Sequence, residues 1–265
     1  MLATRWWRAF RYRLVVATAR RASTDCTNFL RVRTQFEVLV DAVLTHLAPA
    51  GLTRDLEIVV LGCSTGAEPY SIASVLTRYR PDLRFHVRAA DIDAALIARA
   101  RRARYQSHEV LDCWAVDDDF VMHTFQREAD AFVVKPEIAR HVSFEVADLL
   151  DPGLVQRFGR ADVVFAQNVL FHFPRRQARF AFQQLCALLR GPGALFIAGM
   201  DLDLRVRLTR KHGLLPLEHR VREIHEDARV LRGRFWPWYY WGLEEYQPNR
   251  RDHVHRYATI FLKQP

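Results

Sequence analysis

The sequence predicts an α/β fold in which helices cover both faces of a mostly parallel sheet, preceded by a short helical segment. Three observations support this prediction. After residue 50, short apolar runs rich in β-branched residues alternate with helical patterns. The first of these runs ends in a glycine-containing loop that opens a helix. The next run ends in an acid, Asp91, where the carboxyl ends of parallel strands gather.

Residues 1–50 are predicted to be helical. A first helix over about residues 5–22 is indicated by apolar residues at helical spacing, which are Trp6, Trp7, Phe10, Leu14 and Val15. Residues 1–24 also contain six arginines and no acid, which is typical of an organelle transit peptide or of a helix that rests on an acidic surface. We favour the structural helix. A second helix is predicted over about residues 33–48, before Pro49 and Gly51.

Residues 51–265 are predicted to form the main domain. We expect strands at about residues 56–61, 85–90, 142–146, 161–167, 194–198 and 257–262, and helices at about 68–79, 94–104 and 180–189. Residues 105–140 show no regular pattern and are predicted to be an insertion. Residues 200–250 form an extra segment with an aromatic cluster of Phe235, Trp236, Trp238, Tyr239, Tyr240 and Trp241. We interpret this cluster as packing against the sheet, with a pocket lining as the alternative.

The loop from Gly62 to Glu68 is the segment with the most chemical information. Its glycines allow positive φ and close approach of a ligand to the backbone, and the following helix begins with unpaired N–H groups. Asp91 is of a type that accepts hydrogen bonds from ribose hydroxyls in nucleotide-binding folds. The glycine spacing argues against a dinucleotide fingerprint and against a P-loop. A second acid, Asp148, follows a later strand and fits either an adenine amino group or a helix N-cap.

Five segments, in matching order over about residues 24–200, resemble the CheR family, whose members methylate glutamates of bacterial chemotaxis receptors. The first runs from Gly62 to Ala73 and reads GCSTGAEPYSIA, and its part from Thr65 to Ala73 is distinctive. Three others, ADID at 90–93, ADLL at 147–150 and QNVLFHF at 167–173, are weaker singly. TNFLR at 27–31 resembles the family's T-x-F-F-R segment, which closes the cofactor site from the helical side.

The resemblance implies a Rossmann-like class I methyltransferase with a seven-stranded sheet, a short N-terminal helical domain, and S-adenosylmethionine (SAM) as cofactor, with S-adenosylhomocysteine (SAH) as product. The residues implied to bind SAM are Thr27, Arg31, Gly62, Ser64, Thr65, Gly66, Glu68, Asp91, Ile92, Asp148, Leu149, Gln167 and Asn168. Glu68 and the glycine loop would hold the amino-acid end of SAM, Asp91 its ribose, and Asp148 its adenine. Residues 105–140 match the place where the family inserts a small β-subdomain that docks on receptors.

Arg31 and His172 are the candidate catalytic residues. By the resemblance, Arg31 lies near the transferred methyl, where it would pair with a carboxylate that is already anionic at pH 7 and needs no base. Gln167 and His172 stand where the family usually has Arg and Tyr. A hydroxyl acceptor would need a general base, and His172 has a suitable side chain.

Three functions therefore stay open. The first is carboxyl O-methyl transfer to a carboxylate-bearing acceptor, either a glutamate of a receptor protein or a small acid. The second is O- or N-methylation of a small molecule with His172 as base. The third is a regulatory protein that binds SAM without transferring its methyl.

Composition and charge bear on the compartment, on metal binding and on the kind of partner. The chain of 265 residues carries a formal net charge of +9, and we attach no function to its arginine excess. Four scattered cysteines, without metal-ligand spacing, predict reduced thiols in a cytoplasmic protein and no metal site. No apolar run approaches the roughly 20 residues of a membrane span. The charge suits nucleic acid, but no motif of the Asn-Pro-Pro-Tyr type supports a nucleic-acid substrate. No oligomeric state is predicted.

Overall fold

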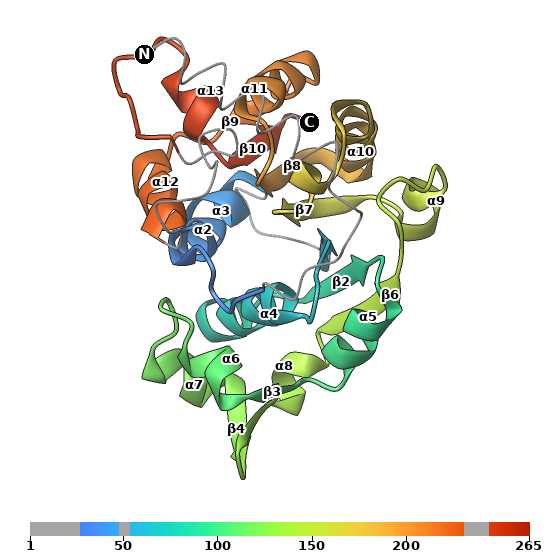
Figure 1. Ribbon diagram of the computed structural model, residues 1–265, viewed down its shortest axis with the longest axis vertical. Coiled ribbons are helices and arrows are strands. Elements are labelled where there is room, and N and C mark those ends of the chain that lie inside the picture. Colours follow the sequence, from blue (N-terminus) through green and yellow to red (C-terminus); the bar gives the residue numbers. More distant parts are fainter. Residues whose placement is uncertain (1–26, 48–53, 231–243) are drawn as a thin grey trace.

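The computed structural model describes residues 27–47, 54–230 and 244–265 (Figure 1). The predicted helix over residues 5–22 and the aromatic cluster at 235–241 lie outside these residues. Within them, no helix is both long and apolar enough to cross a membrane.

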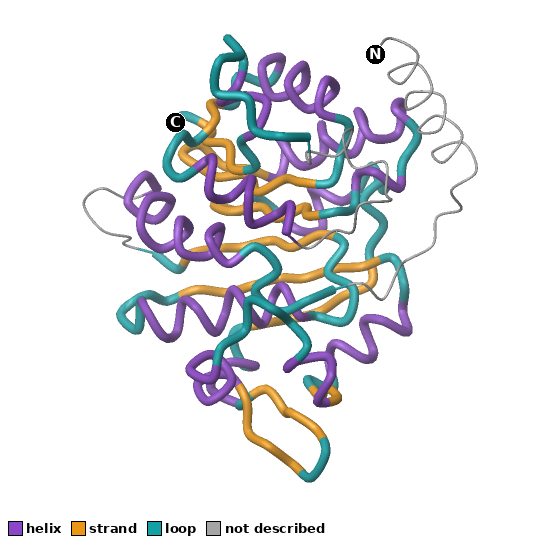
Figure 2. Tube along the Cα trace, turned by 60° about the vertical axis from the view of Figure 1, so that its left-hand side comes forward, coloured by secondary structure: helices purple, strands orange, loops and turns teal. Residues whose placement is uncertain are grey.

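A seven-stranded sheet runs through the middle of the molecule (Figure 2). Its order is β6-β2-β1-β7-β8-β10-β9, and the strands are β1 (Leu56–Leu61), β2 (Phe85–Asp91), β6 (Val142–Val146), β7 (Ala161–Gln167), β8 (Leu189–Ala198), β9 (Leu215–Pro216) and β10 (Ile260–Lys263). The first five of the series are parallel, while β10 runs antiparallel to both β8 and β9. The predicted seven-stranded, mostly parallel sheet is confirmed.

Helices cover both faces of the sheet. Successive residues of a strand point to opposite faces, so a strand that is apolar throughout must be covered on both sides. On one face, Leu56, Ile58 and Val60 of β1 pack with α2 (Arg33–Val38), the helical turns η1 (Leu39–Val43) and α3 (Leu44–Leu47), and α4 (Ala67–Tyr79). On the other face, Val59 and Leu61 pack with α10 (Arg175–Leu188) and α11 (Leu202–Lys211). A strand buried on both faces is continuously apolar, which explains the sequence of β1.

Several predicted boundaries were wrong by a few residues. The helix predicted over 94–104 is α5 (Ala94–Arg101), which ends early because Ala103 takes a positive φ of 51°. The helix predicted over 180–189 begins five residues earlier, at Arg175, because its first turn is exposed and lacks the apolar signal. The last strand begins at Ile260 instead of Tyr257, since α13 (His253–Tyr257) precedes it, and β8 begins at Leu189 instead of Ala194.

The region predicted as irregular, 105–140, is structured. It contains a three-stranded antiparallel sheet, β3 (Arg104–Gln106), β5 (Ala131–Val134) and β4 (Phe125–Glu128), with α6 (Ser107–Leu111), α7 (Asp118–Thr124) and α8 (Pro136–Ala139). A small β-sheet at this place is what the family resemblance implies. It lies at the end of the molecule remote from α11 and α13 (Figure 1).

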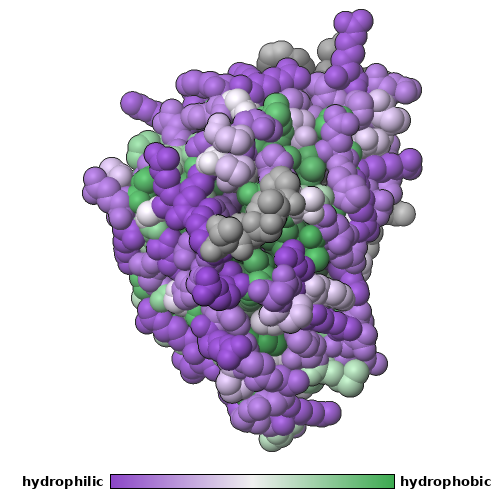
Figure 3. All heavy atoms as spheres, turned by 180° about the vertical axis from the view of Figure 1, so that it is seen from behind, coloured by the Kyte–Doolittle hydropathy of each residue, from purple (hydrophilic) through white to green (hydrophobic). Residues whose placement is uncertain are grey.

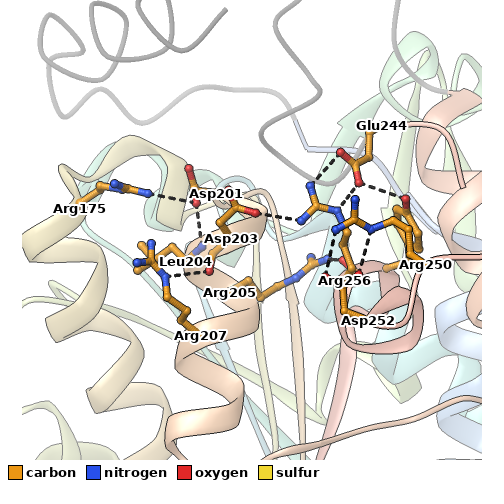
Figure 4. Close-up of polar contacts among 11 residues, drawn as sticks. Arg175, Asp201, Asp203, Leu204, Arg205, Arg207, Glu244, Arg250, Asp252 and Arg256 are labelled. Atoms are coloured by element: carbon orange, nitrogen blue, oxygen red, sulfur yellow. Dashed lines mark hydrogen bonds and ion pairs between the residues drawn. The ribbon is translucent and has the colours of Figure 1, made fainter. Parts of the chain in front are cut away.

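A network of charges around the buried Arg205 and Arg256 ties the C-terminal segment to α11. Arg256 of α13 donates to Asp203 and to Glu244, each over 2.9 Å (Figure 4). The fully buried Arg205 donates to the backbone oxygens of Ile197 (3.4 Å) and Arg256 (2.6 Å). Arg205 thereby links the end of β8 to α13. Beyond α11, α12 (Val221–Val230) packs against α2.

The face of the molecule opposite to that of Figure 1 is predominantly polar. Viewed from behind, hydrophilic residues cover most of the molecule, and hydrophobic atoms gather toward the middle of this face (Figure 3). Most of the buried apolar residues belong to the two core clusters, one on each face of the sheet.

Candidate functional site

A cavity lies at the carboxyl ends of the central strands. The strand order reverses between β1 and β7, and at such a switch point the loops after neighbouring strands separate and leave a crevice. The cavity, including its open mouth, comprises about 1060 Å³. Its walls come from the loops after β1, β2, β6 and β7 and from the segment around α2.

Most of the sequence-predicted site residues line this cavity. They are Thr27, Arg31, Gly62, Ser64, Glu68, Asp91, Ile92, Asp148, Leu149, Gln167, Asn168 and His172. Thr65 and Gly66 lie behind the wall instead. The backbone oxygen of Thr65 accepts a hydrogen bond from the Tyr105 hydroxyl over 2.7 Å, and Gly66 begins α4 with a φ of 91°.

The loop after β1 packs tightly against the loop after β7. Gly62 has a φ of +77°, and a Cβ atom there would stand 2.9 Å from the side chain of Val169. The loops after β1 and β7 therefore touch, and only glycine fits between them. A hydrogen bond of 3.0 Å from the Gly66 N–H to the Cys63 oxygen closes the turn, and Ser64 within it has a φ of 50°.

Asp91 fastens this loop to the end of β2. One of its carboxylate oxygens accepts from the Ser64 N–H (2.9 Å) and the other from the Asp93 N–H (3.1 Å). The residue is 7% exposed and lines the cavity. Because each carboxylate oxygen has a further lone pair, Asp91 can still accept from hydroxyls of a ligand.

Asp148 lies in the turn after β6. Its Oδ1 accepts from the Leu150 N–H over 2.8 Å, which is a local turn that Asp side chains stabilise. The alternative prediction, a helix N-cap, is wrong, since Gly153 holds that position for α9 (Leu154–Phe158). Asp148 and Leu149 instead form one wall of the cavity.

Glu68 and Arg31 face the same space. Glu68 lies in the first turn of α4, and its removal from water raises the pKa of the carboxyl to about 8. The positive charge of Arg31 acts in the opposite direction and lowers this pKa. A cationic group of a ligand placed beside Glu68 would favour the ionised carboxylate in the same way.

This raised pKa predicts a pH-dependent stability. Between its ordinary pKa of 4.5 and about 8, Glu68 holds a proton in the folded chain and not in the unfolded chain. Stability contributed by this group is therefore full below pH 4.5 and is lost as the pH rises toward 8. We expect Glu68→Gln to raise the melting temperature of the ligand-free protein at about pH 8.5 and to change it much less at about pH 5.

Thermal melts across this pH range test the expectation. Glu218→Gln is the control, because Glu218 is exposed to solvent. A melting-temperature difference for Glu68→Gln that stays constant with pH would contradict a raised pKa of Glu68 in the folded chain.

His172 ends the short 3₁₀ turn η2 (Leu170–His172) that follows β7. It is half-buried, and burial lowers the pKa of its imidazole, partly offset by the negative charge of Asp91. The ring lies beside that of Phe171, with 3.9 Å between the centroids. A neutral imidazole is therefore present at the cavity at pH 7.

Sequence reasoning missed some cavity residues and one behind them. Asn28, Phe36 and Phe173 line the cavity. Gln35, behind the wall, accepts a hydrogen bond from Gln167 over 3.0 Å. A sequence signal did exist, since Gln35 interrupts the buried face of a helix that also carries Phe36.

Comparison with known proteins identifies the family. Residues 25–207 match the family described as CheR methyltransferase, SAM binding domain. The chain is 32% identical over 193 residues to the probable biofilm formation methyltransferase WspC of Pseudomonas aeruginosa, which covers 72% of this chain and 44% of that protein. It is 28% identical over 173 residues to a chemotaxis protein methyltransferase of Listeria innocua, covering 65% and 63%. The chain thus spans less than two thirds of each of these relatives.

Among solved structures, the likeness is lower. An O-methyltransferase family protein from Burkholderia thailandensis has a TM-score of 0.42 and 17% identity, with coverage of 80% of this chain and 55% of that one. The family match, by contrast, covers more than half of the chain and includes the cavity from Thr27 to His172. The resemblance read from the motifs is confirmed: the chain belongs to the CheR family of SAM-dependent methyltransferases, with SAM as the cofactor.

Proposed function

We propose that this chain is a carboxyl O-methyltransferase that acts on a protein glutamate. The observation that carries the proposal is the charge of the cavity. Among the lining residues that the structure describes, Arg31 is the one with a permanent positive charge, while Glu68, Asp91 and Asp148 are acids. A negatively charged acceptor would therefore be drawn to Arg31 and turned away from the other walls.

The polar groups that line the cavity suit SAM. Asp91 and Ile92 on one side, with Asp148 and Leu149 nearby, suit the ribose and adenine. Gly62 and Ser64 of the loop after β1 line the cavity, where the amino-acid end would lie. When bound, SAM supplies a methyl group activated by its sulfonium.

The residues of the chain would then align the acceptor. Arg31 is suited to hold the acceptor carboxylate through a bidentate pair, which fixes the direction of an oxygen lone pair. A carboxylate carries no proton to remove, so the transfer needs alignment and no general base. The carboxylate oxygen would form the bond to the methyl carbon as the carbon–sulfur bond of SAM breaks. The products are a methyl ester and SAH.

The named relatives support a protein acceptor. One of them is called a chemotaxis protein methyltransferase, and the family resemblance points to receptor glutamates. By this reasoning the partner of the chain is a receptor-type protein with accessible glutamates.

A second candidate is O- or N-methylation of a small molecule, with His172 as the base. It is favoured by the neutral imidazole at the cavity, which is the form that accepts a proton. A third, a SAM-binding regulator without transfer, would bind the cofactor and methylate no acceptor.

The chemistry of the product separates these functions. We expect that a cell extract incubated with the enzyme and SAM labelled on its methyl group gains labelled protein that releases labelled methanol in mild alkali. Esters release methanol under these conditions, whereas ethers and methylated amines do not. Mass spectrometry of the labelled protein then locates the glutamate.

His172→Phe provides the matching variant. We expect it to leave the rate of methanol-releasing label close to wild type, because an anionic acceptor needs no base. A large loss of rate, with alkali-stable label, would favour the small-molecule or hydroxyl function. Cofactor binding without any labelled product would favour the regulator.

A further inference from the structure

A chain of hydrogen bonds lies behind the cavity wall, from β7 through α2 to the residue before β10. The amide nitrogen Nε2 of Gln167 donates to Oε1 of Gln35 over 3.0 Å, and Nε2 of Gln35 donates to Oγ1 of Thr259 over 2.5 Å. Gln35 and Thr259 are only 4% and 6% exposed. A buried amide is costly unless its polar atoms are bonded, so its two partners hold Gln35 in a fixed orientation.

This series of hydrogen bonds sets the direction of the Gln167 amide. The nitrogen of this amide points to Gln35, so its oxygen Oε1 points the other way, toward the cavity that Gln167 lines. No residue that the structure describes donates a hydrogen bond to this oxygen. An amide oxygen only accepts, so this point of the wall suits a donor such as an ammonium and repels a carboxylate.

The position of Gln167 indicates which part of a ligand it meets. In the parallel pairing of β1 and β7, Val60 lies opposite Phe165. β1 ends at Leu61 and β7 at Gln167, so Gln167 lies at the same edge of the sheet as Gly62, which begins the loop after β1. Val169, two residues after Gln167, packs against Gly62. The amino-acid end of SAM, which carries one ammonium and one carboxylate, is the part proposed to lie there.

We propose that Oε1 of Gln167 accepts a hydrogen bond from the ammonium group of bound SAM, and that Gln35 is the positioning residue that keeps this oxygen toward the cavity. The inference rests on the proposed function only in that SAM occupies the cavity. It adds a specific contact for one group of SAM and a role for a buried residue that does not touch it.

Hydrogen bonds that run in the opposite direction along this series would lead to a different prediction. If the Thr259 hydroxyl donated to Gln35 and Gln35 donated to Gln167, the NH₂ group of Gln167 would face the cavity and favour the cofactor carboxylate. Gln35→Glu separates the two directions. A glutamate at this position can accept from Gln167 and from the Thr259 hydroxyl, but it cannot donate to Gln167.

Calorimetry of the full chain with two ligands tests the proposal. SAH carries the ammonium, and 5′-methylthioadenosine lacks the whole amino-acid end. We expect Gln167→Met to weaken SAH binding by about 10-fold or more, since the lost bond is to a charged group. Binding of 5′-methylthioadenosine should be unchanged, which also shows that the variant is folded. Gln35→Met should weaken SAH binding less, because the freed amide can still turn, and Gln35→Glu should restore near wild-type affinity.

The double variant Gln35→Met/Gln167→Met should bind SAH no more weakly than Gln167→Met alone, because Gln35 acts through Gln167. Unchanged SAH affinity in Gln167→Met, or an equal loss for both ligands, would overturn the proposal. So would a Gln35→Glu variant as weak as Gln35→Met, which would assign the opposite direction. In each of these cases the wild type still binds SAH. A wild type that binds neither ligand would overturn the proposed function as well.

Discussion

Replacing Asp91 by alanine is expected to lower the affinity for SAM by at least about 100-fold. Two losses combine, each worth about 1.5–3 kcal/mol for a bond to a charged group. The substitution removes the proposed acceptor of the ribose hydroxyls. It also frees the N–H groups of Ser64 and Asp93, which the carboxylate now holds in place. Titration calorimetry with SAM or SAH measures the effect directly.

Asp93→Ala is the matched control for this variant. Asp93 is an acid two residues further on, and its carboxylate caps α5 by accepting from the Ala95 and Leu96 N–H groups. It does not line the cavity. Loss of an N-cap costs about 1 kcal/mol of folding stability, so a lower melting temperature with unchanged SAM affinity is expected. If Asp91→Ala bound SAM as tightly as the wild type, the ribose role would be refuted.

Replacing Arg31 by alanine is expected to lower turnover by about 100-fold or more, because it removes the charged group that orients the acceptor. The affinity for SAM should fall far less, since the proposed partner of Arg31 is the acceptor carboxylate. The rate of labelled methanol release gives the turnover, and calorimetry gives the affinity. A variant with normal turnover would rule out the orienting role.

Arg33→Ala is the control with the same loss of charge on the neighbouring helix. Arg33 pairs with Asp117 (2.6 Å) and Glu37 (3.3 Å) and does not line the cavity. Its ion pairs are part-exposed and are worth little, so stability should change slightly. Turnover should stay at the wild-type level. A loss equal to that of Arg31→Ala would show that net charge, and not position, matters.

Much of the site could be read from the sequence because its residues follow strands. Gly62, Asp91 and Gln167 each come at or just after the end of a parallel strand, and Asp148 follows two residues after another. Parallel strands of one sheet end at a shared edge, so these side chains meet whatever the rest of the fold does. The strands β1, β2, β6 and β7 were also found almost at their true bounds, since β1 and β7 contain compact apolar runs and β2 and β6 alternate apolar with polar residues.

Prediction of secondary structure from the sequence failed where the local pattern was too short or too polar. Strands β3, β4 and β5 have three or four residues each, which leaves little room for an alternating pattern to stand out. The first five residues of α10 include Arg175, Arg176 and Arg179, and exposed charges give no apolar spacing to mark a helix. The two misses have different causes: the short strands do face the core but are too short for a pattern, while the exposed start of α10 gives no apolar spacing.

Long-range contacts are a separate class that no local pattern contains. The Tyr105 hydroxyl reaches the backbone of Thr65, and the Gln35 amide meets Gln167, across 40 and 132 positions of the chain. A tyrosine or a glutamine in these segments is unremarkable until folding brings its partner within 3 Å. These contacts decide how firmly the cofactor loop and the cavity wall are held.

The amino-acid sequence alone determined the family and the cofactor, through its motifs. It also determined the edge of the sheet where the cavity lies, because loops that follow parallel strands are placed by the strands themselves. Tertiary structure alone decided that Thr65 and Gly66 lie behind the wall, that Glu68 shares its space with Arg31, and that the Gln167 amide is turned by Gln35. The direction of a side chain depends on neighbours brought from distant segments, and burial then sets the charge it carries.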